Sequence, residues 1–258
     1  MENTLQLKSL KMNYKSEEIL VFCPVYNEAH HLKDLIDEIK STKFLGDFLF
    51  INSGSADDSE KLIKKSGFNY INLKKNEGIG NVIMEAIKYG NQNNYKVLCL
   101  IAGNSKMRPK YINKILDPIV FENFDFVQGS RYLNFGSTKN MPNFRKIVIP
   151  ITSKLFSFLY RKKMTDATCG FRAFKLSLVN SASYNIYANW LKKYAFEPYL
   201  YSNVLLDKNV KSTEVPITMD YPDKNSKIKY TKIKPLLDYP ALFIPYVLAL
   251  INPKKFNV

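Results

Sequence analysis

The sequence predicts an α/β domain in which helices flank a mostly parallel central sheet. Continuous apolar runs typical of buried strands alternate with segments of helical spacing over residues 19–102. Clusters of Asn, Ser, Gly and Asp follow several of these runs, as expected for loops at strand ends. The chain has 258 residues, 46% hydrophobic and 14% aromatic, which is enough to bury a full core.

The first hundred residues carry the most regular pattern. The apolar run at 19–23 ends at Pro24 and predicts a buried strand, and the spacing of Leu32, Leu35 and Ile39 predicts a helix over 31–43. The expected elements that follow are a strand at 47–52, a turn at 53–58, a helix at 59–66, a strand at 70–73, a helix at 80–89 and a strand at 95–102. This alternation of strand and helix is the basis for expecting a parallel sheet.

Beyond Pro109 the pattern is less regular. We expect a strand at 126–130, a loop at 134–143, helices at 145–160 and 190–206, and a strand at 214–217 whose Pro216 suits a sheet edge. Residues 222–234 are basic and loop-like, and residues 236–258 are apolar with three prolines. The predicted organisation is a polar segment over 1–18, one domain over 19–235 and an apolar tail over 236–258, which together with the basic segment forms a C-terminal extension.

The residue counts and missing motifs exclude several classes of protein. Cys23, Cys99 and Cys169 lie too far apart for a disulfide framework or a CxxC zinc site, and the adjacent His30 and His31 are too few for a His-based metal cage. The motifs GxGxxG, GxxxxGK(S/T) and GxSxG are absent. Their absence argues against nicotinamide-dependent dehydrogenases, P-loop NTPases and α/β-hydrolases.

The charge balance favours an anionic partner. Lys and Arg number 38 against 23 Asp and Glu, a formal net charge of +15. Nucleic acid, acidic lipid and phosphorylated small molecules all suit this charge, although codon usage in an AT-rich genome explains part of it. We expect neither a signal peptide in the polar residues 1–18 nor a membrane span. The longest apolar run, 240–251, would reach roughly 18 Å as a helix, against a hydrocarbon core of ~30 Å.

Four polar loops follow predicted strands, at residues 24–28, 52–57, 102–106 and 129–132. Ligands of open α/β sheets bind outside the carboxyl ends of the strands, so we expect these loops to converge on one ligand site. Amide and carboxylate groups suit a nucleobase or ribose, and Lys and Arg suit phosphate. The competing explanation is that these residues only form turns and helix N-caps.

The motifs in these loops resemble the family 2 glycosyltransferases, which have the GT-A fold. PVYNE at 24–28, NSGSAD at 52–57 and NEGIG at 76–80 occur in the order typical of that family. The family's dolichyl-phosphate mannose synthase branch, in which the acceptor is often a polyprenyl phosphate, has motifs similar to GSRY at 129–132, Arg145, DATCGFR at 166–172 and EVPI at 214–217. The resemblance implies transfer of a sugar from a nucleotide-sugar donor, with inversion, to a polyprenyl-phosphate-type acceptor.

The resemblance also implies roles for individual residues. Those expected at the donor nucleotide are Pro24, Tyr26, Glu28, Asn52, Asp57, Asn104 and Lys106. Those expected at the acceptor or donor phosphates are Arg131, Arg145, Arg172 and Lys232, and the expected catalytic residues are Asp166, Arg131 and Arg145. A bidentate arginine on a phosphate is sensible chemistry independently of the family.

The sequence departs from the family at its metal motif. The family usually has two aspartates where this chain has Asn52 and Ser53, and an Asp-x-Asp motif at 102–104, where this chain has Ala102 and Asn104. Mg²⁺ or Mn²⁺ bridging a diphosphate prefers carboxylates, and Asn104 offers only a neutral carbonyl. One hypothesis is that Lys106 supplies the ion's charge. The alternatives are a solvated loop lysine, or an ion held by Asn104, water and the substrate phosphates.

A phosphate acceptor simplifies the expected mechanism. Its oxygen is already anionic at neutral pH, so the reaction needs in-line placement and stabilisation of the leaving diphosphate rather than a strong base. A sugar hydroxyl acceptor would need a carboxylate base, for which Asp166 is the best candidate. The competing explanation for Asp166 is an N-cap or an ion pair with Arg172.

The C-terminal extension predicts contact with an anionic membrane surface. The basic segment precedes the apolar run at 240–251 and is interleaved with aromatic residues; its lysines are Lys224, Lys227, Lys229, Lys232 and Lys234. The alternative for the apolar run is a helix packed on the domain or a homodimer contact. No nucleic-acid-binding module accompanies the lysines, so we expect no nucleic acid partner. The predicted location is cytoplasmic, peripheral to the inner face of the cell membrane.

Three functions remain open on the sequence. The first is sugar transfer to a polyprenyl phosphate, and the second is a glycosyltransferase of surface-polysaccharide assembly that uses a sugar hydroxyl. The third is a non-catalytic nucleotide-sugar-binding protein whose metal motif has decayed. The missing carboxylates favour the third function, whereas an enzyme is favoured by Arg131, Arg145, Asp166 and Arg172.

Overall fold

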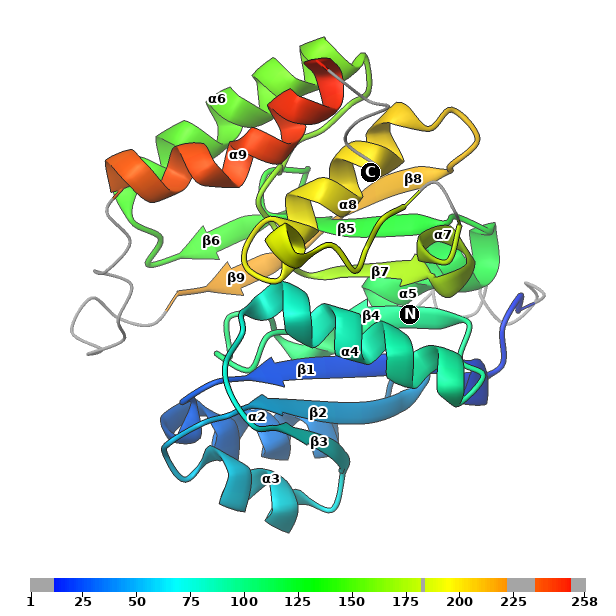
Figure 1. Cartoon of the computed structure of the whole chain (residues 1–258), viewed down its shortest axis with the longest axis vertical. Coiled ribbons are helices and arrows are strands. Elements are labelled where there is room, and N and C mark those ends of the chain that lie inside the picture. Colours follow the sequence, from blue (N-terminus) through cyan, green and yellow to red (C-terminus); the bar gives the residue numbers. More distant parts are fainter. Residues whose placement is uncertain (1–11, 182–183, 222–234, 252–258) are drawn as a thin grey trace.

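A seven-stranded sheet organises the computed structural model, which describes residues 12–181, 184–221 and 235–251 (Figure 1). Its strand order is β3-β2-β1-β4-β7-β5-β8. The strands are β1 Ile19–Val25, β2 Asp47–Ser53, β3 Asn69–Leu73, β4 Val97–Leu100, β5 Phe126–Ser130, β7 Arg172–Lys175 and β8 Ser212–Pro216. Neighbours run parallel except around β7, which is antiparallel to β4 and β5. The predicted mostly parallel sheet is confirmed.

Helices cover both faces of this sheet. They are α2 Ala29–Ser41, α3 Ser59–Ser66, α4 Ile79–Gln92, α5 Ile112–Glu122, α6 Asn143–Tyr160, α7 Leu176–Val179, α8 Phe196–Leu206 and α9 Pro235–Ile251. Along β1, Ile19 and Val21 belong to the core with α2, α3 and α5, whereas Leu20 and Phe22 belong to the core with α4 and α8. Burial on both faces is the reason that the strand reads as a continuous apolar run.

Several elements beyond Pro109 differ from the sequence expectation. The predicted loop at 134–143 contains a short strand, β6 Ser137–Lys139, which pairs in parallel with β9 Thr218–Asp220. The sequence pattern does not predict α5, whose helical signal is weakened by Pro118 inside it. The predicted helix at 190–206 begins only at Phe196, after a 3-10 turn at Asn189–Leu191. The four-residue β7 is too short to give a periodic signal of its own.

Within the described part of the tail, helix α9 packs against α6 and α8. Tyr246 is 1% exposed, its hydroxyl donates to the carbonyl of Ala167 at 2.8 Å, and its own carbonyl accepts from the Tyr160 hydroxyl at 2.7 Å. The predicted alternative of a helix packed on the domain is therefore realised on one face of α9. Within the described chain, no helix is both long and apolar enough to cross a bilayer. The predictions for residues 222–234, Lys232 included, lie outside the described residues.

The start of α4 lies against the backbone of the 191–193 segment. The N–H of Gly80 donates to the carbonyl of Lys193 at 3.1 Å. A Cβ atom added at Gly80 would lie 1.9 Å from the carbonyl oxygen of Leu191, a contact that only a backbone shift could relieve. The second glycine of NEGIG, Gly80, is therefore required because two backbone segments approach each other closely at this position.

Gly80→Ala is expected to lower the free energy of unfolding by about 1–3 kcal/mol, because the backbone must move to admit the methyl group. The intrinsic helix preference of alanine acts in the opposite direction. Urea denaturation measures the effect. The control is Gly90→Ala in the same helix, where the nearest neighbour is the flexible end of Leu176. Equal stability of the two variants would contradict the prediction.

Candidate functional site

The loops after β1 and β2 are joined by hydrogen bonds. Asn27, with a left-handed φ of 54°, accepts from the N–H of Ala56 at 2.8 Å and donates its own N–H to the Ser55 hydroxyl at 3.0 Å. That hydroxyl donates to Asn52 Oδ1 at 2.6 Å. Polar groups predicted in two separate loops therefore lie together, as the carboxyl ends of parallel strands require.

Asn52 and Asp57, both expected to hold the donor base, are engaged within the protein. Asn52 is 1% exposed and donates through its amide to Asn72. Asp57 accepts from the N–H groups of Ala29 and Ser59, both at 3.0 Å. Partial burial acts to raise the pKa of Asp57, but these hydrogen bonds keep it below its ordinary value. Both side chains shape the loops, and their contact with a base stays a prediction.

The first and third loops meet through their backbones, and Tyr26 of the first loop is partly exposed. The N–H of Gly103 donates to the carbonyl of Pro24 at 3.2 Å. A Cβ atom at Gly103 would lie 2.8 Å from that same carbonyl oxygen, so the approach needs glycine. Tyr26 is 47% exposed, which leaves its ring accessible to a ligand. The exposure of Tyr26 is therefore compatible with its predicted contact with the donor nucleotide, which stays a prediction.

Lys106 is a buried lysine at the end of the third loop. It is 6% exposed, and its Nζ lies 5.1 Å from the centre of the Tyr221 ring. Burial lowers the pKa of Lys106 to about 7, and repulsion from Arg145 and Arg131 acts in the same direction, against the attraction of Glu28. These four charged side chains thus lie within electrostatic reach of one another.

Glu28 is the carboxylate of this group. Burial raises the pKa of Glu28 to about 7, although the charge of Lys106 opposes the rise. One of its carboxylate oxygens is buried with no hydrogen-bond partner. In the described residues, the ligand atoms of Glu28, His30 and His31 lie within 4.8 Å of one another. The sequence counts the two histidines as too few for a metal site. In the structure the Glu28 carboxylate lies beside them, so three potential ligands are close together.

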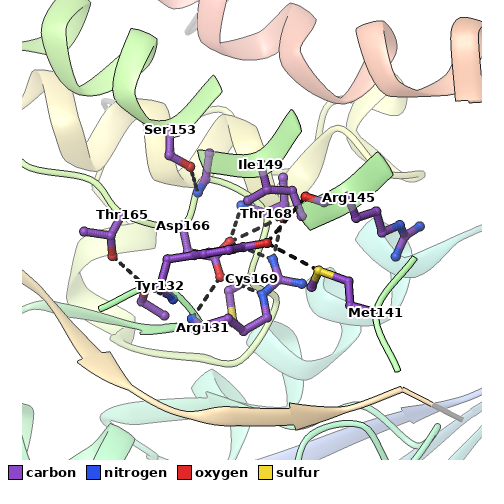
Figure 2. A network of polar contacts seen from close by, with 12 residues as sticks. Arg131, Tyr132, Met141, Arg145, Ile149, Ser153, Thr165, Asp166, Thr168 and Cys169 are labelled. Atoms are coloured by element: carbon purple, nitrogen blue, oxygen red, sulfur yellow. Dashed lines mark hydrogen bonds and ion pairs between the residues drawn. The ribbon is translucent and has the colours of Figure 1, made fainter. Parts of the chain in front are cut away.

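Arg131 and Asp166 form a buried ion pair (Figure 2). Arg131 Nε and Nη2 donate to the two carboxylate oxygens at 2.6 and 2.7 Å, and the Arg131 N–H donates to Oδ2 at 3.1 Å. The guanidinium also donates to the hydroxyls of Tyr221 and Thr168. Burial acts to lower the pKa of Arg131, but the charge of Asp166 raises it well above its ordinary value.

The partner of Asp166 corrects one prediction. The sequence suggests an ion pair with Arg172, but the structure pairs Asp166 with Arg131. Arg131 is 5% exposed and Asp166 0%, and both carboxylate oxygens are held by the guanidinium. A carboxylate in that environment is poorly placed to take a proton from a sugar hydroxyl. The geometry favours a positioning role for the pair, and the predicted catalytic and phosphate contacts stay predictions.

Arg172 supports the DATCGFR loop from inside the protein. Its Nη2 donates to the carbonyl of Cys169 at 2.6 Å and lies 3.4 Å from Glu197 Oε1, and its Nη1 donates to the Glu197 carbonyl at 3.1 Å. Arg172 is only 3% exposed. This geometry does not support the predicted contact of Arg172 with the acceptor phosphate, because the side chain is buried and both Nη groups are directed at the protein.

Other supports of this loop are not identified by sequence reasoning. Glu214 accepts from the N–H of Asp166 at 3.1 Å, Ser153 accepts from the N–H of Ala167 at 2.9 Å, and the Tyr246 hydroxyl donates to the Ala167 carbonyl. These three residues come from β8, α6 and α9. No local motif connects such distant segments, although Glu214 does begin the EVPI motif.

Arg145 comes from the first turn of α6. Its carbonyl accepts from the hydroxyl of Tyr132 at 3.4 Å, and the side chain is half-buried. In Figure 2 its guanidinium extends away from the Arg131–Asp166 pair. The charge of Arg145 lowers the pKa of Lys106, so the two cations lie within electrostatic reach of each other. Arg145 is therefore the predicted phosphate-binding arginine whose side chain is best placed for a ligand.

The family of the chain follows from comparison with known proteins. The profile of Glycosyl transferase family 2 matches residues 20–182, which is more than half of the sequence. The chain belongs to this family. The predicted family and enzyme class, a glycosyltransferase, are thereby confirmed, and the alternative of a non-catalytic binding protein loses its support.

Two relatives have names that mention polyprenol or dolichyl phosphate. The polyprenol monophosphomannose synthase of Mycolicibacterium smegmatis is 26% identical over 184 residues, 66% of this chain and 69% of that protein. The UDP-N-acetylglucosamine--dolichyl-phosphate N-acetylglucosaminyltransferase of Methanococcus voltae is 24% identical over 223 residues, 80% of this chain and 86% of that protein. The chain spans 65% of a further relative, the uncharacterized protein MJ1222 of Methanocaldococcus jannaschii.

A solved structure confirms the fold of the glycosyltransferase. Glucosyl-3-phosphoglycerate synthase from Mycobacterium tuberculosis, in complex with Mn²⁺, uridine diphosphate and glucosyl-3-phosphoglycerate, aligns with a TM-score of 0.62. The alignment covers 92% of this chain and 79% of that one, at 16% sequence identity. At that identity the likeness establishes the architecture alone.

The loop at 102–106 does not fit a resident divalent ion. Ala102 ends in a methyl group, Asn104 Oδ1 accepts the N–H of Lys106 at 3.3 Å, and Lys106 brings a positive charge of its own. Mg²⁺ and Mn²⁺ prefer sites with carboxylate ligands. The residues around Asn104 therefore do not support its predicted contact with a metal ion.

Proposed function

We propose that this glycosyltransferase moves a sugar from a nucleotide-sugar donor, with inversion, to a polyprenyl phosphate at a membrane surface. Two relatives have polyprenol or dolichyl phosphate in their names, which supports this acceptor class. The observation that carries the proposal for this chain is an apolar stripe on α6 that begins beside Arg145. The proposed location is peripheral, at the inner face of the cell membrane.

The stripe consists of large side chains on one face of α6. Ile147, Ile151, Leu155 and Phe158 are 62%, 60%, 53% and 79% exposed. Their spacing of three or four residues places them on the same side of the helix. Helix α9, which lies beside α6 in Figure 1, adds Ile244, Val247, Leu248 and Ile251. We call these eight residues the apolar face; exposed patches of this kind mark interaction sites.

The charges around the apolar face select its partner. Lys146, Lys154, Arg161 and Lys163 are exposed on α6 or just after it, and α6 contains no acidic residue. An anionic bilayer complements this combination of apolar and basic groups. A second copy of the chain docked through the same face would bring like charges together. The pattern therefore favours an anionic lipid surface over a homodimer.

The position of Arg145 connects this surface with the site of sugar transfer. Arg145 lies in the first turn of α6, two residues before Ile147, and its charge reaches Lys106. A polyprenyl phosphate bound along α6 would place its apolar chain on the bilayer side and its phosphate beside Arg145. Charge-assisted hydrogen bonds from arginine to phosphate are among the stronger polar contacts in proteins.

A phosphate acceptor also suits the environment of Asp166, whose carboxylate is buried in an ion pair. An acceptor phosphate oxygen is already anionic and needs no strong base. It attacks the anomeric carbon from the face opposite the leaving group, forming the new C–O bond as the bond to the nucleoside diphosphate breaks. Arg145 and Lys106 would stabilise the negative charges that meet in this step.

The test offers labelled nucleotide sugars together with a polyprenyl phosphate, an unphosphorylated polyprenol or a free oligosaccharide. Label is expected in the lipid fraction only with polyprenyl phosphate. Transfer to the oligosaccharide would overturn the proposal in favour of a reaction on a sugar hydroxyl. Transfer to the unphosphorylated polyprenol would show that the phosphate is not the attacking group, and would overturn it equally.

Arg145→Gln is expected to raise the KM for polyprenyl phosphate about 10- to 100-fold, because one charge-assisted contact to the acceptor is lost. The KM for the donor is expected to change much less. Lys154→Gln removes the same charge from the same helix and serves as the control. Similar acceptor KM values for the two variants would mean that Arg145 acts only through general attraction to the membrane.

A further inference from the structure

We propose that Lys106 binds the donor diphosphate in place of a divalent ion, so that nucleotide binding by this chain does not depend on Mg²⁺ or Mn²⁺. The inference rests on the nucleotide-sugar donor of the proposed function, but it requires no particular acceptor. It starts from the disagreement between the 102–106 loop and the Asp-x-Asp motif that the family usually has there.

The first argument is the set of side chains in the loop. Where two carboxylates are usual, the chain has a methyl group at Ala102 and a neutral amide at Asn104. Two residues beyond Asn104 it has an ammonium group. The loop has therefore lost the negative charges that hold a divalent ion and gained a positive charge that repels one. The same exchange makes the loop attractive to a diphosphate, which carries the opposite charge.

The second argument is that Lys106 is held in place. The Lys106 N–H donates to Asn104 Oδ1, and the Lys106 carbonyl accepts from the N–H of Asp220 on β9 at 3.4 Å. Ser105 has a left-handed φ of 55°, and Met107 forms a bridge to Met219. Both neighbours of the lysine are thus fixed by the fold. A charged group whose backbone is already fixed loses little entropy when it binds its ligand.

The third argument is the charge around the ammonium group. Lysine is rarely buried to the extent of Lys106 unless its charge is paired. Glu28 attracts Lys106, while Arg145 and Arg131 both repel it. Arg131 is neutralised by its own ion pair, so the repulsion between Lys106 and Arg145 is the larger of the two. An added anion would relieve the repulsion between these two cations, whereas a divalent cation would increase it.

The described residues contain one competing cation site, the group of Glu28, His30 and His31. The Nε2 atom of His31 is buried without a hydrogen-bond partner, which leaves it available as a ligand. The positive charge of Lys106 acts on both Glu28 and His31, however, and would repel an ion bound between them. The geometry therefore favours the lysine, and the histidines supply a control for the experiment.

Calorimetric titration of the full chain with UDP, GDP, dTDP and CDP tests the inference, each nucleotide being added in EDTA and then in Mn²⁺. One nucleotide is expected to bind with the same affinity in both conditions. Lys106→Met, which keeps the apolar stem of the side chain, is expected to weaken that binding about 10- to 100-fold. Lys110→Met removes an exposed lysine on the following turn and is expected to leave binding unchanged.

A second variant tests the inference through a gain of metal-dependent nucleotide binding rather than a loss of binding. Ala102→Asp/Asn104→Asp/Lys106→Gln restores two carboxylates and removes the ammonium. Its nucleotide binding is expected to be weak in EDTA and to recover in Mn²⁺, since a divalent ion can then bridge the carboxylates and the diphosphate. Thermal melting of each variant verifies that it is folded. A triple variant that binds equally in EDTA and Mn²⁺ would count against the inference.

The following results would overturn the inference. Binding by the unchanged chain only in Mn²⁺ would show that an ion is required while leaving the proposed acceptor untouched. Loss of that Mn²⁺-dependent binding in His30→Ala/His31→Ala would place the ion at the histidines. Unaltered binding by Lys106→Met would remove the lysine from the site. Failure of every nucleotide to bind in both conditions would overturn the proposed donor and this inference together.

Discussion

Arg131→Met is expected to lower the free energy of unfolding by about 3–5 kcal/mol, the usual effect of removing one partner of a buried ion pair. The Asp166 carboxylate would stay 0% exposed and lose the guanidinium that neutralises its charge and donates to both of its oxygens, keeping only the neutral donors of the Arg131 backbone and Thr168. Asp166→Leu is expected to be similarly destabilising, because it leaves the arginine unpaired. Urea denaturation followed by circular dichroism measures both variants.

The double variant Arg131→Met/Asp166→Leu is expected to regain most of the lost stability, because no unpaired charge remains buried. Arg108→Met is the surface control. Arg108 lies 2.9 Å from Glu38 with its side chain 39% exposed, and its loss is expected to change stability by less than about 1 kcal/mol. Arg131→Met with an effect no larger than this control would contradict the prediction.

The same double variant separates the two roles considered for Arg131. A purely positioning role predicts that a stable double variant binds nucleotide and shows a lowered kcat with little change in the KM for the acceptor. If Arg131 contacts the acceptor phosphate directly, the KM for polyprenyl phosphate is expected to rise and to account for most of the fall in kcat/KM. Steady-state kinetics on the folded variant therefore tests the phosphate-binding role that the resemblance implies.

Ile147→Ser/Ile151→Ser/Phe158→Ser is expected to reduce binding to anionic vesicles by a factor on the order of 100 or more. Full burial of one large apolar side chain contributes about 1.5–3 kcal/mol, and three side chains are removed from the apolar face at once. All three are more than half exposed, so folding should be little affected. Transfer to polyprenyl phosphate in vesicles should fall in parallel, while nucleotide binding stays unchanged.

Co-sedimentation with vesicles of phosphatidylcholine and phosphatidylglycerol measures this binding, with pure phosphatidylcholine as the uncharged comparison. Tyr70→Ser is the control, because Tyr70 is 41% exposed on β3 at the opposite edge of the sheet from β8. Equal vesicle binding by the triple variant and the Tyr70 control would contradict membrane contact through this face. Conversion of a dimer to a monomer by the triple variant would assign the face to a second copy of the chain.

The elements of the first hundred residues could be predicted because their signals are local. The run Ile19–Val25 is apolar throughout since both faces of β1 are covered, and α2 shows the spacing of a helix packed on one side. The periodic pattern does not predict an element that is very short or that is interrupted by proline. β6 and β7 have only three and four residues, and α5 contains Pro118.

The sequence also predicted which loops form the candidate site, because strand ends carry the polar clusters. It determined the family, through motifs whose order is readable in the chain. It also identified Ala102 and Asn104 as the departure from the expected metal motif, with Lys106 two residues further on. It could not assign Arg131 to Asp166 or Glu214 to the DATCGFR loop. Those partners are 35 and 48 residues apart, and only the fold brings them together.

The sequence by itself determined the alternation of strands and helices, the family and the residue types at the strand ends. The tertiary structure decided which of those residues remain available to a ligand. It buried Arg131, Asp166 and Arg172 in contacts with the protein and left Arg145 beside an exposed apolar helix face. The physical reason is that motif and periodicity follow from neighbours along the chain, whereas the exposure and partners of a charged group depend on segments that meet only on folding.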